Sequence, residues 1–156
     1  MEDNMKEIKI KKMQKKDIKN IYKIGLMYFE GEKWYTKDFL EESLKRKGLH
    51  FTAIKNKKIM GAIMIGLEDE PRAWIYFFCV TKKERRQGIG NRLLKKVENK
   101  LPKEYSVVFV DFESKDKSAE KFYEKNGFKK RAKIKDWFGL NHKGLIYEKK
   151  NVDHSF

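Results

Sequence analysis

Cysteine is almost absent from the sequence, which has one, Cys79, in 156 residues. A single thiol cannot form an internal disulfide, so the fold must be held by a hydrophobic core. Cys79 lies in the apolar segment 74–80, where a cysteine acts as a small buried hydrophobic residue. We expect a structural thiol, because a catalytic one needs a histidine partner and no histidine is near it in sequence.

Histidine and proline are also scarce, with three and two residues. The histidines show no metal-ligand spacing, so we predict no metal site. Pro71 and Pro102 each lie between periodic segments, where turns are expected. Because no linker, repeat or low-complexity segment interrupts the chain, we predict one domain over residues 1–156.

Long apolar runs are missing as well. None approaches the ~20 residues that a membrane-spanning helix needs. Segment 1–16 is charged and lacks the apolar stretch of a secretory signal. We therefore expect a cytoplasmic protein without membrane contact.

Positive charge, in contrast, is abundant: the net charge is +15. It favours a nucleic-acid partner, a smaller polyanion such as a cofactor with several phosphates, or a generally Lys-rich surface. The lysines are spread from Lys6 to Lys150 rather than gathered in one block. This spread favours the polyanion or the Lys-rich surface, and nucleic acid stays open as the less favoured partner.

Hydrophobic periodicity predicts an α/β domain with a mixed sheet. Strands are expected at 7–12, 50–55, 59–67, 73–81, 105–113, 128–135 and 144–149, and helices at 17–29, 36–48, 88–100 and 118–126. Asp17 and Thr36 are predicted N-caps. Gly127 is expected in the left-handed conformation that ends a helix.

The segment Arg85-Arg86-Gln87-Gly88-Ile89-Gly90 joins a predicted strand to a predicted helix. The first N–H groups of a helix lack internal partners and carry partial positive charge, so such an end binds phosphate. Glycines let a ligand approach the backbone. The segment matches neither a Walker A loop nor a dinucleotide fingerprint, because Leu93 occupies the third glycine position.

A second segment, 119–128, reads Ala-Glu-Lys-Phe-Tyr-Glu-Lys-Asn-Gly-Phe. Together with Arg85-x-x-Gly88-x-Gly90, and in the same order, it resembles the acetyl-CoA-binding motifs of the GNAT superfamily of N-acetyltransferases. The resemblance implies a GNAT fold, with a mixed central sheet of about six or seven strands and about four flanking helices. The ending after Phe128 resembles protein N-terminal and ribosomal-protein acetyltransferases.

The resemblance implies acetyl-CoA as co-substrate, with no metal. The end of the strand before the loop would pair with the pantetheine arm, and backbone N–H groups would hold the phosphates. Asp116 occupies a place where many relatives carry a cofactor-contacting Asn, so its role is either cofactor contact or a helix cap. The implied cofactor-binding residues are Phe78, Cys79, Val80, Arg85, Arg86, Gln87, Gly88, Ile89, Gly90, Asn91, Asp116 and Tyr123.

Two residues match catalytic positions of the family. Tyr123 corresponds to the tyrosine that protonates the leaving thiolate, which is feasible because a phenol has a pKa of ~10 and a thiol ~8.5. The alternative is that Tyr123 is only an aromatic residue of the core. Asp111 falls where the protein acetyltransferases carry a glutamate base, and it would act through a water. The alternative is that Asp111 is only a surface carboxylate, either solvated or in a salt bridge.

The family chemistry implies direct attack of an amine on the thioester, without an acyl-enzyme. We expect a protein or peptide amine as acceptor. The alternatives are a small amine, such as a polyamine or an antibiotic, and a non-catalytic acyl-CoA-binding or RNA-associated protein. A homodimer stays open.

Overall fold

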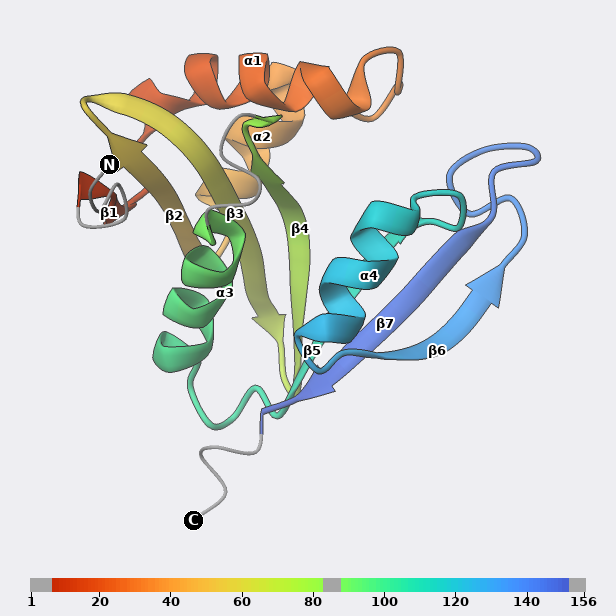
Figure 1. Cartoon of the computed structure of the whole chain (residues 1–156). Helices are drawn as coiled ribbons and strands as arrows, with labels where there is room; N and C mark the ends of the chain where they lie inside the picture. The colour runs from red at the N-terminus through yellow and green to blue at the C-terminus, as the bar shows by residue number, and fades with distance from the viewer. Residues whose placement is uncertain (1–6, 83–87, 152–156) are drawn as a thin grey trace. The chain divides into compact units, whose positions relative to one another are not determined.

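The computed structural model describes residues 7–82 and 88–151, and its elements follow the predicted order (Figure 1). The helices are α1 (Ile18–Phe29), α2 (Lys37–Lys45), α3 (Ile89–Lys100) and α4 (Lys117–Lys125), and a 3-10 helix, η2 (Lys15–Asp17), precedes α1. The strands are β1 (Lys9–Lys12), β2 (Gly48–Lys55), β3 (Lys58–Asp69), β4 (Arg72–Val80), β5 (Val107–Glu113), β6 (Lys129–Ile134) and β7 (Gly144–Lys150).

The strands form a mixed seven-stranded sheet in the order β1-β2-β3-β4-β5-β7-β6. β4 and β5 are parallel, with paired residues from Arg72–Val107 to Ile75–Val110. Strands β1 and β2, β2 and β3, β5 and β7, and β6 and β7 pair antiparallel. A parallel pair needs a crossover connection, and α3 supplies it. The predicted α/β fold with a mixed sheet is confirmed.

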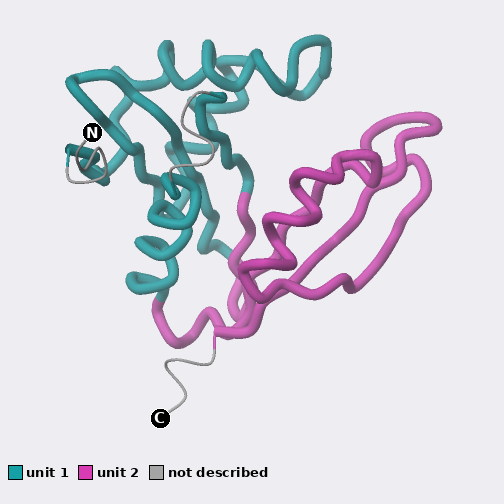
Figure 2. Tube along the Cα trace, viewed as in Figure 1, with its two compact units in different colours: residues 1–68, 76–101 teal, residues 69–75, 102–156 magenta. Residues whose placement is uncertain are grey.

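The chain divides into two compact units (Figure 2). Unit 1 contains residues 1–68 and 76–101, and unit 2 contains residues 69–75 and 102–156. The boundary passes through β4, so the residues of β4 that pair with β5 belong to unit 2 and the remainder to unit 1. The prediction of a single domain stays a prediction.

In unit 1, α1 and α2 cover one face of the strands. α1 turns Ile18, Ile21 and Ile24 inward at helical spacing. They pack into one buried cluster with Leu40 of α2 and with the β3 and β4 side chains Ala62, Met64, Phe77 and Cys79. Cys79 is only 7% exposed there, which confirms the predicted buried thiol.

The opposite face of the unit 1 strands is covered by α3, which packs against β2 and β1. Its buried stripe contains Ile89, Leu93, Leu94 and Val97. Leu93 lies over Gly61 of β3, where an added Cβ would come within 3.3 Å of the leucine Cδ1. Close packing along this stripe fixes α3, and its first turn is thereby held in place.

In unit 2, one face of β5 is apolar and the other is polar. Val108, Val110 and Phe112 are buried. The Phe112 ring lies 5.5 Å from that of Tyr123 on α4 and 5.1 Å from that of Tyr147 on β7. Successive side chains of a strand point to opposite faces, so Asp111 and Glu113 lie on the other face.

The predicted helix ends have mixed outcomes. The Thr36 hydroxyl accepts the Phe39 N–H at 3.0 Å, and Gly127 has φ +91°, so both predictions are confirmed. Asp17 stands at the predicted N-cap position of α1, but its side chain makes no cap bond there. η2 precedes α1, and at its end the Asp17 carboxylate accepts the Gln14 N–H at 2.8 Å instead of capping α1.

Candidate active site

The first turn of α3 is the part of the predicted phosphate loop that the structure describes; Arg85, Arg86 and Gln87 lie outside the described residues. Gly88 stands immediately before α3 with φ 77°, a left-handed conformation that glycine adopts without strain. The Gly88 carbonyl accepts the Arg92 N–H at 3.0 Å, which closes the first helical turn.

The N–H groups of Ile89, Gly90 and Asn91 come before that first turn closes, so the helix offers them no acceptor. No side chain among the described residues caps this end of α3. The helix dipole adds partial positive charge at the same place. This end of α3 therefore has the donors and the charge that an anion such as a pyrophosphate requires.

The end of β4 contains the residues predicted to pair with the pantetheine arm, Phe78, Cys79 and Val80. The Cys79 side chain is buried, so any contact with a cofactor would involve its backbone. The Val80 carbonyl accepts the Tyr28 hydroxyl at 2.6 Å. Because a carbonyl oxygen has two lone pairs, this bond leaves room for a second donor.

Tyr123 lies near the end of α4 and is 6% exposed. Its ring stacks on Phe112 and meets Phe128 edge-on at 5.2 Å. The Phe128 N–H donates to the Tyr123 carbonyl and the Gly127 N–H to the Glu124 carbonyl, the paired bonds of a Schellman motif. Packing and backbone bonds thus hold Tyr123 in one position.

Burial raises the pKa of the Tyr123 hydroxyl, and the negative charges of Asp116 and Asp111 raise it further. The hydroxyl is therefore neutral and keeps its proton at physiological pH. Such a group is a hydrogen-bond donor, and a stable tyrosinate is disfavoured in the same surroundings.

The start of α4 is closed by the chain itself. The Asp116 carboxylate accepts the Ala119 N–H at 3.0 Å, which is an N-cap. The predicted capping role of Asp116 is confirmed, and its contact with a cofactor stays a prediction.

Asp111 lies on the polar face of β5, opposite the face that carries Phe112 and Tyr123. The Trp137 indole N–H donates to its carboxylate at 2.8 Å. Burial raises the pKa of Asp111, and the bond from Trp137 partly offsets that rise. A carboxylate held in one orientation with an elevated pKa is suited to accept a proton.

Glu113 lies on the same face, two residues further along β5. Its carboxylate is 3.4 Å from His142 Nδ1 and 3.3 Å from the Lys115 ammonium. Trp137 and His142 both belong to the connection between β6 and β7. This connection was not among the predicted site residues.

A further contact that the sequence did not reveal joins α4 to β7. The Tyr147 hydroxyl lies 2.8 Å from a carboxylate oxygen of Glu120 and 2.8 Å from one of Glu124. Tyr147 itself is 0% exposed. Glu120 and Glu124 are one helical turn apart, so a single buried hydroxyl fixes the polar side of α4.

Two negative findings concern the described residues. Among the described residues, no group of three or more His, Cys, Asp or Glu side chains is arranged to hold a metal ion. No helix in the same part of the chain is long and apolar enough to cross a membrane.

The family comparison matches residues 15–128 to the model described as "Acetyltransferase (GNAT) family". The chain belongs to the GNAT acetyltransferase family. The match contains the first turn of α3, Asp111 and Tyr123, so the family and the described geometry concern the same residues. This GNAT protein is thereby an N-acetyltransferase family enzyme, and its family uses acetyl-CoA. No match was found among curated protein sequences.

Solved structures with the same fold act on different acceptors. The ribosomal-protein-S18-alanine N-acetyltransferase from Escherichia coli has a TM-score of 0.79 at 18% identity, covering 92% of this chain and 93% of that one. Ard1 from Thermoplasma volcanium has a TM-score of 0.83 at 18% identity, and the alignment covers 92% of this chain and 97% of that one. An aminoglycoside 6'-N-acetyltransferase complexed with coenzyme A has a TM-score of 0.78 at 12% identity, and the alignment covers 92% of this chain and 97% of that one. At these identities the likeness shows the fold.

Proposed function

We propose that this GNAT enzyme transfers an acetyl group from acetyl-CoA directly to an amine of a protein or peptide. The single observation that carries the proposal is the arrangement around β5. At β5, the Asp111 carboxylate is oriented by an indole N–H, and the neutral buried hydroxyl of Tyr123 lies close enough for the charge of Asp111 to raise its pKa. Direct transfer needs these two groups, one for the amine proton and one for the leaving sulfur.

In the proposed reaction, the first turn of α3 binds the pyrophosphate and the end of β4 aligns the pantetheine arm. Asp111 accepts a proton from the amine through a water. The amine nitrogen forms a bond to the acetyl carbon, and the carbon–sulfur bond then breaks. Tyr123 donates a hydrogen bond or its proton to the departing thiolate. Because its pKa is raised, Tyr123 serves best by stabilising the charge on sulfur as it develops.

The surroundings of Asp111 support an amphipathic acceptor. Glu113 is a second acidic residue on the same face, and its carboxylate is paired with Lys115 and lies near His142. Trp137 is 43% exposed and Leu140, in the same connection, is 78% exposed. Exposed apolar side chains beside acidic groups suit the side chain and terminal amine of a peptide better than a small polyamine.

An α-amino group is the favoured form of this amine. Its ordinary pKa of ~7.7–8.0 leaves part of it neutral at physiological pH, whereas a lysine ammonium at ~10.4 is almost wholly charged. An α-amino group therefore needs less help from a base than a lysine does, and one aspartate acting through a water suits it better.

The test is an acetyl-CoA turnover assay with a matched acceptor panel. It contains peptides with free N-termini, the same peptides with blocked N-termini but a free lysine, spermidine, and an aminoglycoside. We expect turnover with free N-termini and at least about tenfold less with the other acceptors, a difference of about 1.4 kcal/mol. Faster turnover of spermidine or the aminoglycoside would support the small-amine alternative. Binding of CoA without turnover of any acceptor would support the non-catalytic one.

A further inference from the structure

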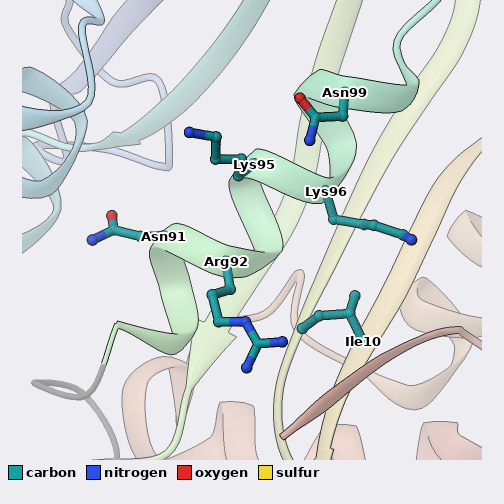
Figure 3. Close-up of a pocket in the computed structure, with 6 residues that line it drawn as sticks. All are labelled: Ile10, Asn91, Arg92, Lys95, Lys96 and Asn99. Carbon is teal, nitrogen blue, oxygen red and sulfur yellow. The ribbon is translucent and has the colours of Figure 1, made fainter. Parts of the chain in front are cut away.

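A groove of about 500 Å³ lies between β1 and α3, within unit 1 (Figure 3). Its lining residues are Ile10, Asn91, Arg92, Lys95, Lys96 and Asn99. Three of the six are cationic, two are amides and one is aliphatic, and none of these described lining residues is acidic. The three cations all come from one short stretch of α3.

The concentration follows from the geometry of α3. Arg92 and Lys96 are one turn apart, as are Lys95 and Asn99, so they form a polar stripe beside the buried stripe of Leu93 and Val97. Arg92 and Lys96 extend toward Ile10 of β1 (Figure 3). The helix side that does not pack on the sheet therefore becomes one wall of the groove.

β1 supplies the other wall and adds a further cation. Ile10 and Lys12 lie on the same face of β1, because they are two residues apart. Lys12 is paired in register with Phe51 of β2, and the Lys96 ammonium lies 5.8 Å from the centre of the Phe51 ring. Lys12 is thus on the same sheet face as the aromatic ring over which the Lys96 ammonium lies.

We propose that this groove binds the sugar–phosphate backbone of a nucleic acid. Phosphate contacts in nucleic-acid complexes come from Arg and Lys together with amide side chains, which are the groups that line it. Along α3 the rise from Arg92 to Lys96 is about 6 Å, so the two cations reach different phosphates of one strand. The net charge of +15 adds long-range attraction.

The lining favours nucleic acid over an acidic protein. Protein interfaces have an apolar centre surrounded by polar residues. Here the only apolar side chain among the described lining residues is Ile10, and it is only partly buried. The cationic and amide groups bind phosphate oxygens without reading bases, so we expect little sequence preference.

The test measures the salt dependence of binding to fluorescein-labelled oligouridylate of about 20 nucleotides, long enough for one binding site. The groove variant carries Arg92→Gln, Lys95→Gln and Lys96→Gln. Each phosphate contact on a single strand contributes about 0.7 to the slope of log K against log salt. Loss of three contacts should lower that slope by about 2 and weaken binding about 100-fold at ~0.1 M salt.

A variant of equal charge change serves as control. Lys129→Gln, Lys130→Gln and Lys133→Gln remove three positive charges from β6, in unit 2. This control should bind as the wild type does, within about threefold, because only long-range attraction is reduced. If both variants lose the same affinity, general charge accounts for the binding and the groove proposal is wrong.

Four further measurements guard against misfolding of the triple variant and distinguish a nucleic-acid groove from a cofactor site and from a site for an acidic protein. The Lys95→Gln, Lys96→Gln double variant keeps Arg92, and its affinity for the oligonucleotide should fall about 25-fold. This variant tests the proposal even if the triple variant misfolds. Acetyl-CoA turnover should persist in both variants. Displacement of the oligonucleotide by saturating CoA would assign the groove to the cofactor and overturn the proposal. Stronger competition by polyglutamate than by unlabelled RNA or DNA would assign it to an acidic protein.

Discussion

Helices α3 and α4 each follow a strand of the sheet, and they differ in what satisfies their first N–H groups. At α4 the Asp116 carboxylate accepts the Ala119 N–H. At α3 the corresponding residue is Gly88, which has no side chain, and no described side chain caps the helix. The first N–H groups of α4 are capped by a carboxylate, whereas those of α3 have no side-chain cap among the described residues and are the proposed anion site.

The two helices consequently serve different purposes. α3 offers backbone donors at its start, and its side chains mainly anchor it. α4 is fixed at both ends, by Asp116 and by the Gly127 motif, and it offers one side chain, Tyr123. Binding of the cofactor and chemistry on the thioester should therefore be separable by mutation.

The largest expected effect is on catalysis by α4. Tyr123→Phe removes the proposed donor to sulfur and should lower kcat about 1000-fold, in the range of general acid catalysis. CoA affinity should stay within about threefold, because the phosphates are proposed to bind at α3, away from Tyr123. Turnover assays and calorimetry measure the two quantities. Phe122→Leu is the neighbouring control and should keep most activity; wild-type kcat in Tyr123→Phe would leave α4 only a packing role.

The next effect comes from giving α3 the cap that α4 has. Gly88→Asp places a carboxylate where the pyrophosphate is proposed to bind. We expect a CoA Kd about 100-fold higher, or about 2.7 kcal/mol, from charge repulsion and occupied N–H groups. Circular dichroism should show a folded protein, because Asp tolerates the left-handed region better than most residues. Unchanged CoA affinity in the folded variant would mean that α3 does not bind the phosphates.

A smaller effect is expected at the start of α4. Asp116→Ala removes the cap and should cost about 1 kcal/mol of unfolding free energy, about 3 °C in Tm. Asp116→Asn keeps a side-chain oxygen that can accept the same hydrogen bond, so its Tm should be close to that of the wild type. If Asp116 only caps the helix, Asn should leave CoA affinity unchanged, and a large change in either direction would show contact with the cofactor.

The smallest effect concerns the polar face of β5. Trp137→Phe removes the donor to Asp111, so the pKa of Asp111 should rise further. A base works only when deprotonated, so the acidic limb of the kcat profile should move to higher pH by about 0.7 units, the equivalent of one hydrogen bond. A profile unchanged by the substitution would remove Asp111 from the mechanism.

The element order and the mixed sheet were predictable because each helix and strand has a clear hydrophobic period. The 3.6-residue spacing of Ile18, Ile21 and Ile24 and the alternation along β5 both survive in the structure. Asp17 was misjudged because a carboxylate before a helix can satisfy more than one N–H group. Only the three-dimensional turn shows that it bonds backward to Gln14.

Contacts between distant segments could not be predicted. The bond from Trp137 to Asp111 joins residues 26 apart, and those from Tyr147 to α4 join residues 23 and 27 apart. The basic groove needs β1 placed beside α3, and no local pattern specifies that.

The proposed phosphate site at the start of α3 is tested most directly by a calorimetric comparison of CoA with pantetheine, which lacks the nucleotide and its phosphates. If the start of α3 is an anion site, CoA should bind at least about 100-fold more tightly, about 2.7 kcal/mol. The difference should shrink to about tenfold or less in Gly88→Asp. Equal affinities for CoA and pantetheine in the wild-type protein would show that α3 does not hold the phosphates.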